Sequence, residues 1–225
     1  MVERKSGSPA QALDLVAARD ELVRLLALDI SDKRVLRAFR QVPRDRFVAA
    51  EARHLAYADR PLSIGHGQTI SQPRMVALML QELDLQKSDK VLDLGSGSGY
   101  QTALIAELAG EVVGVELIPE LVRRSAAVLR DLGYENATVH LAGTQLGWPQ
   151  GAPYTAIAVA AAAPRVPMSL VEQLAQGGRL VLPVGDRHQQ ELLLVTREDE
   201  GLKVSRRGAC RFVPLIGREA YASDE

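Results

Sequence analysis

The sequence contains a single cysteine, Cys210, among its 225 residues. An intramolecular disulfide needs two cysteines, so nothing in the chain indicates an oxidising compartment. Cys210 stands between Ala209 and Arg211 in a strand-like stretch. We interpret it as a small residue within a strand, and a nucleophilic thiol is the alternative.

The sequence also lacks an excess of either charge. Its 27 basic and 28 acidic residues give a net charge of −1. Binding to DNA or RNA depends on Lys and Arg side chains that displace counterions from the phosphates. We therefore expect no nucleic-acid partner. The spacing of His, Cys, Asp and Glu residues does not match a metal site, so we also predict no metal.

No apolar run is long enough to cross a bilayer. The longest is AIAVAAAA at 156–163, well short of the ~20 residues that a membrane-spanning helix needs. The first residues, MVERKSGSPAQALDL, contain no apolar core of the signal-peptide kind. We expect a cytoplasmic protein without a membrane partner, and a monomer.

The first part of the chain has a helical pattern. Ser8 and Pro9 are typical of a helix N-cap and first turn. Apolar residues then recur at roughly helical spacing; they are Leu13, Val16, Leu22, Leu25, Leu26 and Ile30. Further helices are predicted over 32–41 and 72–83.

From residue 90 onward, strand-like and helical segments alternate. Strands are predicted over 90–95, 111–116, 137–142, 154–160 and 178–185, with helices between them over 102–110, 119–133 and 167–177. This alternation is typical of a parallel sheet covered by helices on both faces. Gly110, Gly133 and Gly177 fit the position just after a helix end. Residues 190–198 and 201–214 are expected to pair antiparallel at the sheet edge.

The pattern therefore predicts one α/β domain over residues 1–225, with a doubly wound, mostly parallel sheet. Residues 1–83 form its helical cap and a substrate loop. Residues 84–225 form the cofactor-binding core and the C-terminal strands.

The strongest motif is VLDLGSGSGYQTALIAEL at 91–108, where a strand runs through Gly95, Gly97 and Gly99 into a helix. In a doubly wound sheet this turn lies at the carboxyl edge, where ligands bind. Glycines allow the backbone to approach a ligand closely. Glu116 ends the next strand, and an acidic group in that place typically holds the hydroxyls of a ribose. We infer a ligand that contains a nucleoside.

Two classes of nucleoside ligand fit this motif, a dinucleotide and S-adenosylmethionine. The dinucleotide fingerprint has a third glycine where this chain has Tyr100. Asp93 stands two residues before Gly95, and a carboxylate there would repel a diphosphate but attract a sulfonium cation. We favour S-adenosylmethionine. A dinucleotide, or a turn that binds nothing, remains the alternative at this stage.

A second motif, SIGHGQTISQP at 63–73, has neither a helical nor a strand period. Long polar loops with glycines often bind ligands. This loop precedes the helix that leads into the first predicted strand, so we expect it to cover the cofactor and to shape an acceptor site.

With IGHGQTISQP, DLGSGSGYQTA, LGWPQGAPY, AAAAP, LPVG and RFVPL, the chain resembles the protein-L-isoaspartate (D-aspartate) O-methyltransferases. The resemblance runs from VPRDRFV at 42–48 to RFVPL at 211–215. The glycine motif is shared by many methyltransferases, whereas the QTIS loop together with the RFVPL tail is specific.

The resemblance implies a Rossmann-like fold and a repair reaction on isoaspartyl-containing proteins and peptides. The α-carboxylate of an isoaspartyl residue is methylated by S-adenosylmethionine, and the ester closes spontaneously to a succinimide that partly returns to aspartate. The family's catalytic serine falls on Ser71. The residues that the resemblance places against the cofactor are Ile64, Gly65, His66, Gly67, Gln68, Thr69, Gly95, Ser96, Gly97, Glu116, Gly143 and Thr144.

This chemistry needs no general base, because a carboxylate with a pKa near ~4 is already ionised at neutral pH. Alignment of the reactants can supply the catalysis. Ser71 or Thr69 could orient the acceptor oxygen, and His66 is a base by type but a loop residue by position. A helix N-cap is the competing interpretation of Ser71.

The chain departs from the family pattern at two places. Ala142, Gly143 and Thr144 replace the usual Gly-Asp-Gly, whose aspartate faces the adenine. Thr155 replaces a usual aspartate. The first change removes a hydrogen-bond acceptor for the adenine amino group, and Thr144 or Gln145 would have to replace it. The alternatives are therefore a methyltransferase that esterifies normal aspartate in a specific peptide, and a non-catalytic homologue that binds a partner.

Overall fold

The structure is a computed structural model, and it describes residues 9–222. The predicted N-cap Ser8 lies outside the described residues. Within this range the helices are α1 (Pro9–Leu26), α2 (Lys33–Gln41), α3 (Pro73–Leu83), α4 (Tyr100–Leu108), α5 (Pro119–Asp131) and α6 (Met168–Glu172). None of them combines the length and the apolar character that a membrane-spanning helix requires.

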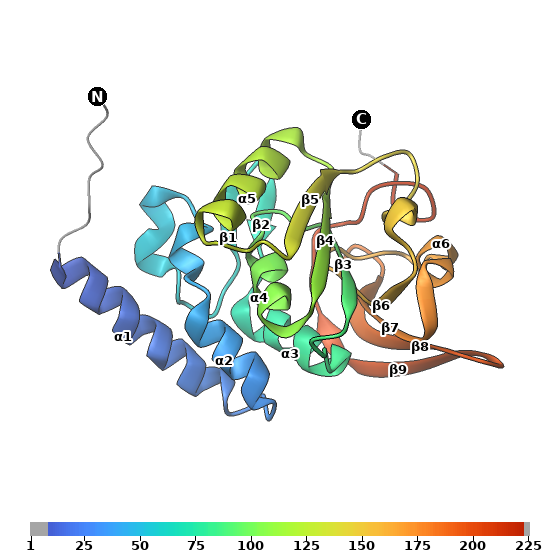
Figure 1. Ribbon diagram of the computed structural model, residues 1–225, viewed down its shortest axis with the longest axis horizontal. Helices are drawn as coiled ribbons and strands as arrows, with labels where there is room; N and C mark the ends of the chain where they lie inside the picture. The colour runs from blue at the N-terminus through green and yellow to red at the C-terminus, as the bar shows by residue number, and fades with distance from the viewer. Residues whose placement is uncertain (1–8, 223–225) are drawn as a thin grey trace.

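A seven-stranded sheet forms the centre of the molecule (Figure 1). Its strands are β3 (Lys90–Leu94), β4 (Glu111–Glu116), β5 (Ala137–Leu141), β6 (Tyr154–Val159), β7 (Leu174–Gly185), β8 (Gln190–Glu198) and β9 (Gly201–Cys210), in the spatial order β5-β4-β3-β6-β7-β8-β9. The strands from β5 to β7 pair in parallel, whereas β8 and β9 pair antiparallel. The predicted α/β fold with an antiparallel C-terminal edge is confirmed.

The two faces of the sheet are covered unequally. Residues of α1 to α5 share one buried apolar cluster with strand residues such as Val91 and Val112. Leu92 and Val113, which point to the opposite face, pack in a second cluster with Leu170 of α6. In Figure 1, α6 accordingly lies on the other side of the sheet from α1 and α2.

The N-terminal helices follow the predicted spacing only in part. Leu22 and Leu26 are buried, but Val16 and Leu25 are 47 % and 48 % exposed and lie on the outer side of α1. Ile30 is buried beyond the end of the helix. The helix predicted over 32–41 is present, with the Asp32 side chain accepting the Arg34 N–H as its N-cap.

The prediction of a helix over 167–177 is wrong for its second half. α6 ends at Glu172, and the chain continues from Leu174 as β7. The Arg197 guanidinium donates to the carbonyls of Val171, Glu172 and Leu174, at 3.4, 3.4 and 2.6 Å. These carbonyls therefore need no further helical turn. Gly177 lies inside β7 and not after a helix, although its φ is +72°, whereas Gly133 follows α5 as expected, with φ +81°.

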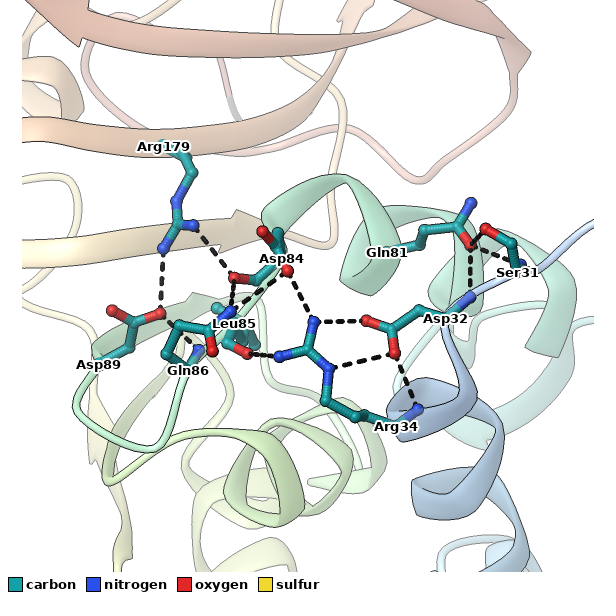
Figure 2. A network of polar contacts seen from close by, with 9 residues as sticks. All are labelled: Ser31, Asp32, Arg34, Gln81, Asp84, Leu85, Gln86, Asp89 and Arg179. Atoms are coloured by element: carbon teal, nitrogen blue, oxygen red, sulfur yellow. Dashed lines mark hydrogen bonds and ion pairs between the residues drawn. The ribbon is translucent and has the colours of Figure 1, made fainter.

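A polar network fastens the helical cap to the sheet (Figure 2). Arg34 of α2 donates to the Leu85 carbonyl at 2.9 Å and forms ion pairs with Asp32 and Asp84 at 2.7 and 2.6 Å. Arg179 of β7 donates to the Asp84 carbonyl at 3.1 Å. The network thus joins α2, the end of α3 and β7, close to where β3 begins.

We predict that Arg34→Met lowers the free energy of unfolding by about 1 kcal/mol, because it removes several linked hydrogen bonds. Arg24→Met is the control: in the part of the chain that the structure describes, Arg24 forms one exposed ion pair, with Glu21, and we expect no measurable change. Urea unfolding followed by circular dichroism measures both variants. Equal stabilities of the two variants would contradict the role of the network.

Candidate active site

A cleft of about 230 Å³ opens at the carboxyl ends of β3, β4 and β6. The chain proceeds outward from β3 in one direction to β4 and β5, and in the other to β6 and β7. Such a reversal leaves a crevice where ligands of α/β proteins bind. The glycine turn after β3, residues 142–147 after β5 and the C-terminal residues 213–218 form its walls.

The glycine turn is held by β4. The N–H groups of Gly95 and Ser96 donate to the Val115 carbonyl at 2.8 and 3.1 Å. Gly95 and Gly97 have φ values of +80° and +53°, a conformation that favours glycine. At these two glycines the turn therefore presents backbone to the cleft, as the sequence predicts.

Glu116 has a structural role in this turn. It is 7 % exposed, and its two carboxylate oxygens accept the N–H groups of Gly97 and Ile118, both at 2.9 Å. A carboxylate oxygen can accept more than one hydrogen bond. Glu116 can therefore hold the turn and still accept ligand hydroxyls from the cleft that it lines.

Asp93 does not lie where the sequence argument placed it. Its carboxylate is fully buried and accepts hydrogen bonds from the Gln101 amide at 2.7 Å and the Thr102 hydroxyl at 2.6 Å. Burial raises the pKa of Asp93 to about 6, the charge of Glu116 adds to this, and the two hydrogen bonds oppose it. Asp93 therefore lies behind Gln101 and influences the cleft through its charge, without contacting a ligand there.

Two buried polar atoms in the cleft have no partner among the described residues. They are Ser96 Oγ and Gln101 Oε1, in side chains that are 5 % and 6 % exposed. Because an unsatisfied buried polar group costs free energy, these atoms indicate a polar ligand. Gln101 is not among the residues predicted from the sequence, although it is a polar residue in the first turn of a largely buried helix.

The predicted loop over 63–73 is in fact a small antiparallel hairpin. Its strands are β1 (Leu62–Gly65) and β2 (Gln68–Ile70). His66 and Gly67 make the turn with φ values of 55° and 70°. The polar composition concealed this hairpin, because its two strands are very short.

Most predicted site residues come together in the cleft. Those that line it are Ile64, Gln68, Thr69, Ser71, Gly95, Ser96, Gly97, Glu116, Gly143 and Thr144. Gly65, His66 and Gly67 form the hairpin turn and are not among the lining residues. Their contact with a cofactor stays a prediction.

Ser71 is half-buried and follows β2 directly. The N-cap of α3 is Gln72, so the competing interpretation of Ser71 as a helix N-cap is wrong. The carbonyl of Ser71 accepts a hydrogen bond from Arg44 at 2.9 Å. Among the described residues its hydroxyl has no hydrogen-bond partner, so it is available to a ligand in the cleft.

The two departures from the family pattern lie at opposite ends of the sheet. Gly143 lines the cleft, and a Cβ added there would meet open space. Thr155 lies near the start of β6, where its hydroxyl accepts from the Lys90 N–H at 3.0 Å and donates to the Lys90 carbonyl at 3.1 Å. The Thr155 replacement therefore does not bear on cofactor binding, whereas Gly143 leaves room that Thr144 or Gln145 borders.

The single thiol, Cys210, is not activated as a nucleophile. Burial raises the pKa of Cys210 to about 11, with Glu191 adding to the shift, which disfavours the nucleophilic thiolate. Cys210 lies at the end of β9, as the strand interpretation expects. Among residues 9–222 no cluster of three or more His, Cys, Asp and Glu side chains is arranged for a metal ion.

Known proteins resemble this chain over nearly its whole length. The family profile for protein-L-isoaspartate(D-aspartate) O-methyltransferase (PCMT) matches residues 19–220. The protein-L-isoaspartate O-methyltransferase 1 of Syntrophobacter fumaroxidans is 50 % identical over 203 residues, 89 % of this chain and 95 % of that protein. The protein-L-isoaspartate O-methyltransferase of Methanopyrus kandleri is 48 % identical over 215 residues, 92 % of this chain and 95 % of that protein.

Solved structures agree with the sequence comparison. A protein-L-isoaspartate O-methyltransferase matches with a TM-score of 0.81 at 26 % identity, covering 89 % of this chain and 66 % of that chain. A Plasmodium falciparum protein of the same description, in complex with S-adenosyl-L-homocysteine, matches with a TM-score of 0.76 at 28 % identity, covering 88 % and 96 %. The chain belongs to the protein-L-isoaspartate (D-aspartate) O-methyltransferase family.

Proposed function

We propose that this protein is an active repair enzyme that methylates the free α-carboxylate of L-isoaspartyl residues in damaged proteins and peptides, with S-adenosylmethionine as the methyl donor. Family membership supports the reaction class. The observation that carries the proposal for this chain is the glycine-lined cleft, with Glu116 in its lining, beside the hairpin that leads to Ser71. A related methyltransferase specific for normal aspartate would use the same cofactor site.

The polar groups of the cleft fit S-adenosylmethionine. Glu116 would take the ribose hydroxyls, while Ser96 Oγ and Gln101 Oε1 offer hydrogen-bonding atoms that have no partner within residues 9–222. Gly143 and Thr144 would border the adenine. When bound, S-adenosylmethionine supplies an electrophilic methyl group on a positively charged sulfur.

Charge in the cleft favours that ligand over a dinucleotide. Asp93 and Glu116 place negative charge beneath the glycine turn. Arg218 is the only cationic side chain among the described residues that line the cleft. Negative charge attracts a sulfonium and an ammonium group and repels a diphosphate.

Ser71 would orient the acceptor. An isoaspartyl α-carboxylate is ionised at neutral pH and needs no base. A hydroxyl without a protein partner can donate one hydrogen bond to such a carboxylate and fix its direction. Thr69, which lines the same wall, is a second donor. Alignment of this kind can contribute several kcal/mol to catalysis.

The setting of the enzyme follows from the same features. We propose a single-domain monomer in the cytoplasm that acts on peptides and proteins and not on nucleic acids. The balance of 27 basic and 28 acidic residues supports the last point. The ester product closes to a succinimide without further help, so the chain needs no residue for that step.

Ser71→Ala is expected to lower kcat for an isoaspartyl peptide by at least about tenfold, because the acceptor loses its orienting hydrogen bond. Cofactor affinity should change less than about twofold. Ser205→Ala is the control, since β9 is an edge strand of the sheet and Ser205 does not line the cleft. Formation of S-adenosylhomocysteine measures turnover, and wild-type kcat in the Ser71→Ala protein would refute the role of Ser71.

The same assay separates the two substrate classes. Isoaspartyl and aspartyl peptides of one sequence are compared with the wild-type protein. Repair predicts methylation of the isoaspartyl peptide only. Methylation of the aspartyl peptide alone would reject the repair function.

A pH titration tests the charge argument. With a pKa of about 6, Asp93 is ionised above pH 6 and neutral below it. Between pH 7.5 and pH 5 we expect the affinity for S-adenosylmethionine to fall about fivefold more than that for S-adenosylhomocysteine, which lacks the sulfonium charge. Asp93→Asn keeps the shape and should abolish this difference. An unchanged pH dependence in the variant would contradict the argument.

A further inference from the structure

Arg44 is a fully buried arginine beside the site, and all its hydrogen bonds go to backbone carbonyls. Its guanidinium donates to the carbonyl of Ala56 at 2.5 Å, of Ala58 at 3.4 Å, of Arg60 at 3.3 Å and of Ser71 at 2.9 Å. Three of these acceptors belong to one segment, 56–60. The fourth is the residue proposed to orient the acceptor.

No ion pair within residues 9–222 neutralises the charge of Arg44. Among the described residues, no carboxylate lies within ion-pair distance, and its Nε atom has no partner. Burial lowers the pKa of Arg44 from its ordinary value, whereas electrostatic interactions with Tyr100, Asp59 and Tyr57 raise it. A buried charge without a counter-ion costs free energy. A fold that needed only packing here could use an apolar residue.

Asp59 holds the residues that follow Ser71. It lies in the segment that wraps Arg44, and its carboxylate accepts the Gln72 side-chain amide at 2.9 Å and the Arg74 N–H at 2.8 Å. The Ser71 carbonyl is thus fixed by Arg44, and the next turn of chain is fixed by Asp59. Ser71 cannot shift without breaking one of these contacts.

Arg44 also contacts the opposite wall of the cleft. Its guanidinium lies 5.6 Å from the ring centroid of Tyr100, the first residue of α4 after the glycine turn. The Tyr100 ring is itself held edge-on by Phe39 at 6.1 Å and tilted against Phe47 at 5.5 Å. Arg44 therefore links the Ser71 side of the cleft to the cofactor side.

We propose that Arg44 is a positioning residue for methyl transfer, which sets the place of Ser71 relative to the glycine turn. The inference rests on the proposed function, because it assumes that Ser71 orients the acceptor. Arg44 acts through the Ser71 backbone and does not line the cleft itself. A misplacement of ~1 Å in such a group can cost ~10²-fold in rate.

Arg44→Met removes every hydrogen bond of the guanidinium while keeping an unbranched apolar side chain. We expect kcat for an isoaspartyl peptide to fall about 10- to 100-fold, with the Kd for S-adenosylhomocysteine changed less than about threefold. Arg34→Met is the matched control, since Arg34 also fastens the helical cap but contacts neither Ser71 nor Tyr100. It should keep wild-type kcat at temperatures below its unfolding.

Arg44→Lys adds a pH dependence of kcat that a purely structural role of Arg44 would not produce. A buried lysine has a lowered pKa. A lysine among these carbonyls should therefore lose its proton as the pH rises from 7 to 10, and with it the charged hydrogen bond to the Ser71 carbonyl. The ratio of its kcat to that of the wild type should fall over this range. The groups that face it are Tyr57, Asp59, Tyr100 and, through the two tyrosines, Arg19 of α1. Burial raises the pKa of both tyrosines, so they do not titrate there.

The outcomes are distinct. Loss of kcat in Arg44→Met beyond that of Arg34→Met, with a falling kcat ratio in Arg44→Lys, supports the proposal. Equal kcat losses in the Met variants, a pH-independent ratio, or failure of Arg44→Lys to fold would assign Arg44 to the fold alone and overturn it. A wild-type protein inactive on isoaspartyl peptides would instead refute the proposed function.

Discussion

The site depends on one pair of hydrogen bonds, those that the Glu116 carboxylate accepts from the Gly97 and Ile118 N–H groups. Parallel pairing of β3 and β4 brings the ends of both strands to one edge. Glu116 then bridges the two loops that leave those ends. Without it, the N–H of Gly97 would lose its acceptor, and the turn that faces the ligand would lose its definition. The residue that would bind the ribose is therefore also the one that shapes the turn.

Charges of opposite sign lie on opposite sides of the cleft around this turn. Negative groups lie beneath the turn, at Asp93 and Glu116, while the buried cation Arg44 lies behind the wall that carries Ser71. The first two suit a cationic methyl donor, and the third fixes the chain that meets the acceptor. The polar network at Arg34 (Figure 2) joins the same layers at the other end of the sheet. Alignment of the acceptor and attachment of the helical cap thus depend on two different arginines, Arg44 and Arg34.

Local patterns predicted the strand, turn and helix of residues 91–108, because glycine spacing and apolar runs are properties of the sequence itself. They failed where contacts between distant segments decide the structure. Arg197 ends α6 early, and Arg44 is buried only because the segment 56–60 wraps around it. The expectation that Asp93 contacts the ligand was wrong. Side chains alternate between the two faces of a strand, and Leu92 and Leu94 both point away from α4, so Asp93 between them points toward α4. The hairpin over 62–70 was missed because it is too short to show a period of two.

The most direct test of the account is a crystal structure of the protein grown with S-adenosylhomocysteine. The account predicts the nucleoside over the glycine turn, with its ribose hydroxyls on Glu116 and the sulfur directed toward the wall that carries Ser71. A turn without ligand at saturating concentration, or the nucleoside bound away from Glu116, would contradict it.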